Sequence, residues 1–564
     1  MFNSIVGERL IFYILVTELI MDQNMMQKLM LLGDEAVAQG AIDAGLSGCY
    51  AYPGTPSTEI MEYVQSFSLS GKHPIQCEWS ANEKTAMEAA LGMSYSGKRA
   101  LTCMKHVGLN VAADPFMNAA ITGANGGLLV VVADDPSMHS SQNEQDSRYF
   151  GKFAMIPVME PSNQQEAYDM AYNSLSLSEK YKIPVMIRLT TRLAHSRSGV
   201  ERREVVEQNK LSLPEDPLQF ILLPTMARKK YKNLLSLQAS FEEESEKSPY
   251  NSLSGNNNIN PGIIACGLAF NYLVENFDDH LPPYPVLKIS QYPVPRKLLS
   301  QFLELCKEVL VIEEGYPLIE ESLIGLTCNG RVIHGRMDGT LPRDGELNPD
   351  LVARALGLPR KKLFEVPEIV RNRLPSLCKG CSHADMFIAL NEAIAGYGKG
   401  RVFSDIGCYT LGAYPPYNSI YTCVDMGASV TMAKGAADAG LVPAVTVIGD
   451  STFTHSGMTG LLDAVNDNSP VTIIISDNSA TAMTGGQKSS ATGRLEEICR
   501  GIGVQSDHLR IIIPLKKNHD ENVRIIKEEL AYNGVSVIIS QRECIQTASK
   551  KKRAEGRGLR AEAG

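Results

Sequence analysis

Apolar, β-branched runs alternate with alanine-rich helical segments along most of the chain. Runs at 445–448 and 471–475 have the composition of buried parallel strands, and residues 458–466 between them predict a crossover helix. A first series of such units extends from Leu31 to about Glu204, with a strand predicted at 127–132. The pattern predicts a multi-domain α/β fold built on open parallel sheets.

Polar residues follow the two later strands at the point where each one ends. Gly449, Asp450 and Ser451 follow the first strand, and Asn478 follows the second, 28 positions after Asp450. Open α/β sheets bind ligands at the carboxyl ends of their strands. Carboxylate and amide oxygens suit Mg²⁺, and glycine allows a close backbone approach to a phosphate. The alternative is an ordinary αβ unit with polar loop ends.

This spacing resembles the thiamine diphosphate signature, in which a Gly-Asp pair precedes an Asn by just under thirty residues. The resemblance implies that the Asp450 and Asn478 side chains and the Ala480 carbonyl hold Mg²⁺ on the diphosphate. It also implies cofactor contacts from Gly449 and Ser451.

Thiamine enzymes need a carboxylic acid against the aminopyrimidine ring, usually from a second domain. Residues 77–92 predict a helix that carries several glutamates. In thiamine enzymes the acid is followed by Ala three positions later and Gly nine positions later. Ala86 and Gly92 match that pattern, which favours Glu83 over Glu78 and Glu88 as the catalytic acid. A solvated helix is the alternative.

Several ordered motifs resemble the 2-oxoacid:ferredoxin oxidoreductases, and most closely the large subunits of indolepyruvate:ferredoxin oxidoreductases. The similarity covers roughly residues 28 to 545, with motifs at 51–60, 104–110, 133–136, 345–347 and 405–412. It implies that Thr55 binds the substrate carboxylate and that Met426 supports the bent cofactor. It also places Gly407, Cys408 and Tyr409 at the cofactor.

Twelve cysteines indicate reduced thiols rather than a disulfide framework. Cys378 and Cys381 form a Cys-x-x-Cys pair, which by itself fits an iron–sulfur cluster, zinc or simple packing. The resemblance implies that Cys408 and Cys544 complete a [4Fe–4S] site, with reduced, buried cysteines as the alternative. His383 is interpreted as a hydrogen-bonding residue at a helix start. Core packing is predicted for Cys49, Cys77, Cys103, Cys266, Cys306, Cys328, Cys423 and Cys499.

Composition is typical of a soluble cytoplasmic enzyme. Apolar residues make up 44% of the chain and the net charge is −9, which argues against a nucleic-acid binder. The apolar start meets Glu18 and Asp22 too soon for a membrane span. We therefore expect neither nucleic acid nor membrane as a partner.

At 564 residues the chain is too long for one hydrophobic core, and three or four domains are expected. Residues 1–27 are interpreted as an extension, with Met21, Met25 or Met26 as alternative starts. After it we predict a pyrimidine-binding thiamine domain at 28–207 and a charged linker at 208–260. A transketolase C-terminal-like domain at 261–345 and a connector at 346–373 follow. The last two units are a diphosphate- and Mg²⁺-binding thiamine domain at 374–546 and a basic disordered tail at 547–564.

The resemblance implies oxidative decarboxylation of arylpyruvates such as indolepyruvate to aryl-acetyl-CoA, with electrons passed to ferredoxin through the cluster. Gly54 would leave room for an aromatic ring, and Lys105 and His106 are candidates for carboxylate or phosphate contacts. Paired large subunits and a smaller β-type partner subunit are expected. The family's large subunits commonly end in a ferredoxin-like domain, whereas the tail of this sequence has no repeated Cys-x-x-Cys-x-x-Cys run.

The sequence also allows two other functions. One is a non-oxidative arylpyruvate decarboxylase, which would need neither a cluster nor coenzyme A. The other is a thiamine-binding, non-catalytic subunit, for which Glu83, Asp450 and Asn478 would be unnecessary.

Overall fold

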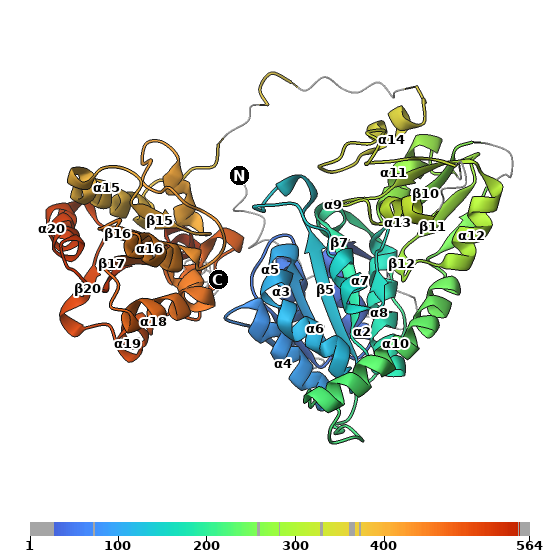
Figure 1. Ribbon diagram of the computed structural model, residues 1–564, viewed down its shortest axis with the longest axis horizontal. Coiled ribbons are helices and arrows are strands. Elements are labelled where there is room, and N and C mark those ends of the chain that lie inside the picture. Colours follow the sequence, from blue (N-terminus) through green and yellow to red (C-terminus); the bar gives the residue numbers. More distant parts are fainter. Residues whose placement is uncertain are drawn as a thin grey trace, which may run out of the picture.

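The computed structural model describes residues 28–71, 74–255, 260–280, 282–326, 331–359, 367–370, 374–550 and 552. It has three open sheets of five to seven strands with helices on their faces, which confirms the predicted α/β class (Figure 1). The expected extension at 1–27, and residues 551 and 553–564 of the expected tail, lie outside the described residues. None of the described helices combines the length and the apolar composition that a membrane span requires.

The first domain is built on a seven-stranded sheet that is parallel except at one edge. Its order is β12 (Gln291–Tyr292), β6 (Val158–Met159), β7 (Val185–Thr190), β5 (Leu128–Asp134), β4 (Ala100–Lys105), β2 (Gly48–Ala51) and β3 (Gln76–Trp79), with β12 antiparallel. Strands β4, β5 and β7 are buried at every residue, as expected for central strands that are covered on both faces. Helices α2 (Gly33–Asp43) and α8 (Gln164–Tyr181) pack on one face, and α4 (Glu83–Tyr95) and α6 (Ala113–Thr122) pack on the other.

The C-terminal domain is a fully parallel five-stranded sheet. Its order is β15 (Val402–Ser404), β16 (Ala444–Gly449), β17 (Val471–Asp477), β21 (Ser536–Gln541) and β20 (Leu509–Ile512). The crossover helix is α18 (Met458–Asn466), at the predicted residues. Because β16 and β17 are parallel neighbours with Gly449 opposite Ser476, the residues that follow them emerge at the same edge.

The middle domain has the sheet order β14 (Val332–His334), β13 (Glu308–Ile312), β10 (Gly262–Cys266), β11 (Val286–Ile289) and β9 (Ser252–Ser254). The expected linker at 208–260 is more ordered than predicted, since it contains β9 and the 23-residue helix α10 (Pro224–Glu246). Helix α10 is mostly charged and polar, but it has a narrow apolar side on which Leu234 and Phe241 are buried.

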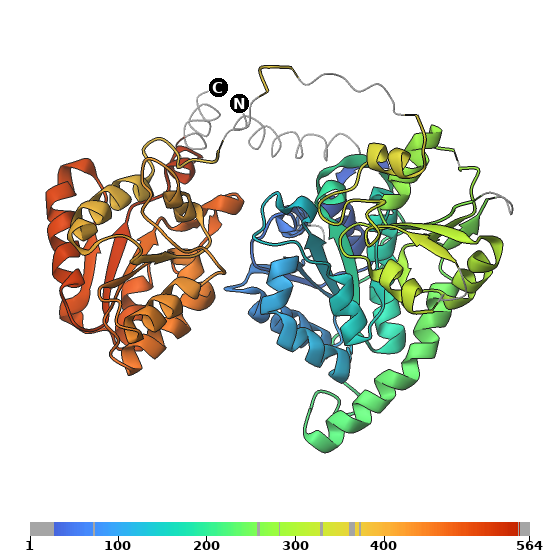
Figure 2. The ribbon, with the colours of Figure 1, turned by 45° about the horizontal axis from the view of Figure 1, so that its top comes forward.

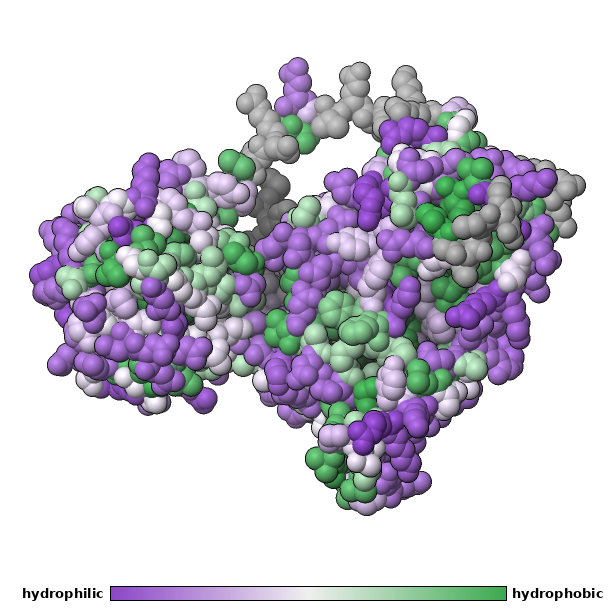
Figure 3. Space-filling view, viewed as in Figure 1, coloured by the Kyte–Doolittle hydropathy of each residue, from purple (hydrophilic) through white to green (hydrophobic). Residues whose placement is uncertain are grey.

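Exposed leucines precede α10, where the sequence predicted a charged bridge. They are Leu211, Leu213, Leu218 and Leu223. The lower end of the molecule, where this segment and the start of α10 lie, shows hydrophobic surface (Figure 3).

The expected disordered tail begins as a helix, since residues 545–550 are helical. Its backbone starts from the loop after β21, with the Ala548 N–H donating to the Cys544 carbonyl at 2.9 Å. Lys550 Nζ donates to the Gly485 carbonyl at 3.0 Å, so at least one basic residue of the tail is used in a tertiary contact.

The first and C-terminal domains meet along a seam (Figures 2 and 3). Across it, the hydroxyls of Tyr52 and Ser451 lie 2.8 Å apart, and Asn82 Nδ2 donates to the His455 carbonyl at 2.9 Å. The start of α4 therefore faces the helix that follows β16.

A buried ionic network joins the first and middle domains. Arg188 has no exposed side-chain surface and pairs with Asp134 at 2.7 Å. Arg148, whose side chain is 1% exposed, pairs at 3.0 Å with Glu313, the residue that follows β13. Buried charges of this kind depend on their partners, because an ion left alone in the interior keeps the full cost of desolvation.

We expect Arg188→Met to destabilise the first domain by about 3–5 kcal/mol, because Asp134 would lose its buried counter-ion. Trp79 on β3 is the only tryptophan of the chain, so its fluorescence during urea unfolding follows this domain. Arg192→Met is the matched control. The Arg192 side chain is 42% exposed and pairs with Glu346, and such pairs contribute about 0–1 kcal/mol. Equal effects of the two variants would contradict this account of the network.

Candidate active site

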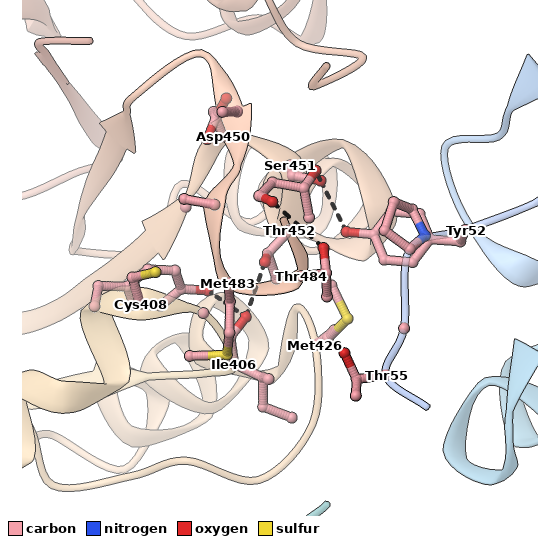
Figure 4. Close-up of a pocket in the computed structure, with 18 of the residues that line it drawn as sticks. Tyr52, Thr55, Ile406, Cys408, Met426, Asp450, Ser451, Thr452, Met483 and Thr484 are labelled. Atoms are coloured by element: carbon pink, nitrogen blue, oxygen red, sulfur yellow. Dashed lines mark hydrogen bonds between the residues drawn. The ribbon is translucent and has the colours of Figure 1, made fainter. Parts of the chain in front are cut away.

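A cavity lies at the seam and is lined from both domains (Figure 4). It brings together most of the residues that the sequence singled out. They are Thr55, Glu83, Lys105, Gly407, Cys408, Tyr409, Met426, Gly449, Asp450, Ser451, Asn478 and Ala480. His106 is not among the lining residues, and its Nε2 lies 3.2 Å from the Asn143 carbonyl instead.

Asp450 begins the short helix α17 (Asp450–Thr452) directly after β16. It is 2% exposed, and its Oδ2 has no hydrogen-bond partner among the described residues. Burial raises the pKa of Asp450 to about 7. Asn478 is also buried, and its Oδ1 accepts from the Ala480 N–H at 3.1 Å. A buried carboxylate oxygen without a donor, beside an amide and a carbonyl, is a suitable ligand set for a hard cation.

Glu83 is the first residue of α4 and is 5% exposed. Its Oε2 lies 2.8 Å from His455 Nε2, across the seam. A Cβ added at Gly108 would lie 2.5 Å from Glu83 Oε1, so that glycine makes room for the acid. The two competing glutamates, Glu78 and Glu88, are exposed and do not line the cavity.

His455 is a residue that the sequence analysis missed. It lies in a π-helical turn (Phe453–Gly457) between α17 and α18, an irregularity that is frequent at functional sites. Its Nδ1 is 2.6 Å from Ser456 Oγ, and the ring of Tyr52 packs edge-on against it at 4.8 Å between centroids. Its position five residues after Asp450 was the only available signal, since its partner Glu83 lies 372 positions away.

The opposite wall of the cavity carries Thr55 and Lys105. Lys105 Nζ donates to the Ser140 carbonyl at 3.0 Å, and burial lowers the pKa of this lysine to about 8. A Cβ added at Gly54 would lie 3.4 Å from the Lys105 side chain. The space expected beside Gly54 is therefore bounded by the stem of Lys105. Figure 4 shows Met426 close to Thr55.

Tyr409 explains two of the glycines at the site. A Cβ at Gly407 would lie 2.3 Å from the Tyr409 ring, and one at Gly449 would lie 2.7 Å from it. The Tyr409 hydroxyl donates to Asp405, which also accepts from Ser429 Oγ at 2.6 Å. Gly449 thus accommodates an aromatic ring as well as leaving the end of β16 accessible.

The four cysteines of the predicted cluster lie near one another, beside the cavity. Burial raises the pKa of Cys408 to about 12, and the neighbouring thiols of Cys381, Cys544 and Cys378 add to the rise. Cys378 and Cys381 lie on the turn before α15 (Ser382–Ile394), and Cys544 follows β21. Gln546 Nε2 donates to Cys378 Sγ at 3.5 Å, which ties that turn to the chain after Cys544.

His383 is the second residue of α15, and its Nδ1 lies 3.2 Å from Cys381 Sγ. Among the remaining cysteines, Cys423 is exposed, which contradicts the packing interpretation for this residue, because its segment lies on the surface. Cys77 is only half-buried, and Cys328 lies outside the described residues. Burial agrees with core packing for Cys49, Cys103, Cys266, Cys306 and Cys499.

Comparison with known proteins points to the same chemistry. A family described as pyruvate flavodoxin/ferredoxin oxidoreductase, thiamine diphosphate-binding, matches residues 39–230. The C-terminal TPP binding domain of thiamine pyrophosphate enzymes matches residues 405–539. These two ranges contain all but three of the predicted site residues, the exceptions being Cys378, Cys381 and Cys544.

Full-length relatives are similar over nearly the whole chain. The indolepyruvate oxidoreductase subunit IorA of Archaeoglobus fulgidus is 39% identical over 94% of this chain and 89% of its own length. The same subunit of Pyrococcus horikoshii is 37% identical over 96% of this chain and 89% of its own length. That of Methanothermobacter thermautotrophicus is 37% identical, with coverages of 92% and 87%.

Proposed function

The chain belongs to the family of indolepyruvate oxidoreductase IorA subunits, which makes it a thiamine diphosphate-dependent 2-oxoacid:ferredoxin oxidoreductase, and we propose that it oxidatively decarboxylates arylpyruvates to aryl-acetyl-CoA. The observation that carries this proposal is the seam cavity. There a buried acid, Glu83, and a buried carboxylate whose Oδ2 has no donor among the described residues, Asp450, face one space from two domains, with four thiols beside it.

Asp450, Asn478 and the Ala480 carbonyl would hold Mg²⁺ on the cofactor diphosphate. Thiamine diphosphate, when bound, serves as the electron sink for decarboxylation. Glu83 would move a proton at the aminopyrimidine ring, and His455 would hold its carboxylate in place, at the 2.8 Å contact described above.

The substrate would enter against the wall formed by Thr55 and Lys105. The Thr55 hydroxyl and the Lys105 ammonium are suited to orient a carboxylate, because both donate hydrogen bonds and the lysine adds charge. Met426, an apolar side chain on the cavity surface, would support the bent cofactor. An arylpyruvate preference rests on the relatives' name and on the small Gly54.

Electrons would leave through a [4Fe–4S] cluster held by Cys378, Cys381, Cys408 and Cys544. Cys408 lines the cavity itself, so a cluster at this place would adjoin the cofactor. Cysteine thiolates are the usual ligands of such clusters. The proposal also includes coenzyme A as the acyl acceptor and ferredoxin as the electron acceptor. It further includes a β-type partner subunit and the pairing of two large subunits.

The deciding experiment uses anaerobically purified enzyme with its partner subunit. We expect iron and sulfide near four of each per large subunit, as a [4Fe–4S] cluster requires. We also expect ferredoxin reduction that needs both indolepyruvate and coenzyme A. Release of an aldehyde without iron or coenzyme A would favour the non-oxidative decarboxylase, and cofactor binding without turnover would favour a non-catalytic subunit.

Cys544→Ser is expected to lose most of the bound iron and ferredoxin reduction, because a cubane needs a ligand at each iron. Iron content and visible absorption after anaerobic purification measure the effect. Cys77→Ser, a half-buried cysteine on β3 of the other domain, is the matched control and should keep its iron. Full iron in Cys544→Ser would exclude this residue as the fourth ligand.

A further inference from the structure

A cluster of two carboxylates and a histidine lies on the first domain, outside the lining of the seam cavity. It comprises Asp34 at the start of α2, Glu59 at the start of α3 (Thr58–Leu69) and His195 at the end of α9 (Thr191–His195). One ligand atom from each residue lies within 4.8 Å of the other two.

Close helix packing brings the three residues together. A Cβ added at Gly33 would lie 2.3 Å from the Leu193 carbonyl oxygen, so only glycine allows α9 to approach the start of α2 this closely. The chain after α9 is fixed as well, because Gln164 Nε2 donates to both the carbonyl and the hydroxyl of Ser196 at 2.8 Å. The three ligand atoms are therefore held by packed helices.

The buried carboxylate of Asp34 receives no hydrogen bond from the described residues. It is fully buried, and among the described residues neither of its carboxylate oxygens has a hydrogen-bond partner. Burial, and then the charge of Glu59, raise the pKa of Asp34 well above its ordinary value. A buried carboxylate that faces a second carboxylate, with no donor, is costly unless a cation or a proton neutralises it.

The next residue shows the contrast. Glu35 accepts two hydrogen bonds from the Arg197 guanidinium, at 2.9 and 3.0 Å, and a third from the Leu32 N–H at 2.8 Å. At the same helix start, Arg197 and Leu32 therefore donate to one acid, whereas no group among the described residues donates to the other.

We propose that Asp34, Glu59 and His195 bind a divalent cation of the Zn²⁺ class, with water completing its coordination. Imidazole nitrogen and carboxylate oxygen are ordinary Zn²⁺ ligands, and three protein ligands plus water are a common set. His195 Nε2 lies 3.5 Å from Glu59 Oε2, close to the ~3.3 Å that separates two ligands of one tetrahedral Zn²⁺. The side chains of His195 and Glu59 are 34% and 36% exposed, which leaves an entry path.

The bound ion would stabilise the packing of three helices next to the active site. Helix α3 begins three residues after Thr55, so an ion shared by α2, α3 and α9 would fix one end of the segment that forms a cavity wall. Loss of the ion should therefore lower the thermal stability of the first domain.

The test is equilibrium dialysis of the complete enzyme, with thiamine diphosphate and Mg²⁺ present, against micromolar Zn²⁺, followed by metal analysis. Wild type should hold one more Zn²⁺ per large subunit than Asp34→Asn or His195→Gln, each of which should bind at that site at least tenfold more weakly. His139→Gln is the matched control. His139 also pairs with a glutamate, but its side chain is 52% exposed and it does not belong to the group formed by Asp34, Glu59 and His195. Zinc held by the cysteines would be the same in all variants.

Thermal melting gives the second readout. Zn²⁺ should raise the melting temperature of wild type and of His139→Gln, and should leave Asp34→Asn unchanged. Asp34→Asn keeps the size of the side chain and removes its charge. Among substitutions of the three ligand residues, it should therefore disturb folding least. Equal zinc content and equal melting shifts in wild type and Asp34→Asn would overturn the proposal. So would the absence of zinc in wild type, in which case Asp34 is buried as the neutral acid.

Discussion

Glu83→Gln is expected to lower turnover by about 10²–10⁴-fold while thiamine diphosphate stays bound. Glutamine has the shape of glutamate and can still form a hydrogen bond with His455 across the seam. It cannot exchange the proton that a carboxylic acid supplies to the aminopyrimidine ring. Turnover with indolepyruvate, together with the bound thiamine diphosphate measured after gel filtration, tests this expectation.

Glu88→Gln is the matched control, because Glu88 lies on the same helix but is exposed. It should keep full activity. Activity retained in Glu83→Gln and lost in Glu78→Gln would transfer the role to Glu78. Loss of cofactor in Glu83→Gln would instead mean that the acid has a binding role.

Asp450→Ala is expected to weaken retention of thiamine diphosphate and Mg²⁺ by about 100-fold or more, because removing one partner of a buried charged contact costs about 3–5 kcal/mol. Without the carboxylate, the diphosphate oxygens and the cation lose an anchor at the end of β16. Thiamine diphosphate and magnesium content after gel filtration measures the loss.

Two observations separate a binding defect from misfolding. Burial raises the pKa of the Asp450 carboxyl to about 7 and its Oδ2 has no partner among the described residues, so removing this poorly solvated group should change the melting temperature little. Asp463→Ala, on the exposed side of α18, should retain the cofactor as wild type does. Tight cofactor binding by Asp450→Ala would exclude Asp450 as the main metal ligand.

Much of the C-terminal domain could be predicted because its signals are local. The apolar runs before Asp450 and Asn478 are the strands β16 and β17, and the intervening helix α18 has the predicted bounds. Parallel pairing of adjacent strands then brings the two residues to one edge, which requires no knowledge of distant parts of the chain.

Contacts between distant segments could not be predicted in the same way. The Glu83–His455 pair joins residues 372 positions apart, and no spacing rule applies at that separation. Helix α10 was missed because its apolar side is narrow and most of its residues are charged or polar. The prediction of a disordered tail was wrong for residues 547–550, because that helical turn starts from the loop after β21 and the basic composition gives no sign of it.

The seam itself has a thermodynamic consequence. The cofactor cavity is lined by both domains, and a ligand that contacts both stabilises their association by an amount that grows with its concentration. The reverse holds by reciprocity, since a change that strengthens contacts such as Tyr52–Ser451 should tighten cofactor binding to the extent that the domains are undocked without the cofactor. Cofactor binding and the docking of the two domains are therefore coupled, so loss of thiamine diphosphate should weaken the contact between the domains.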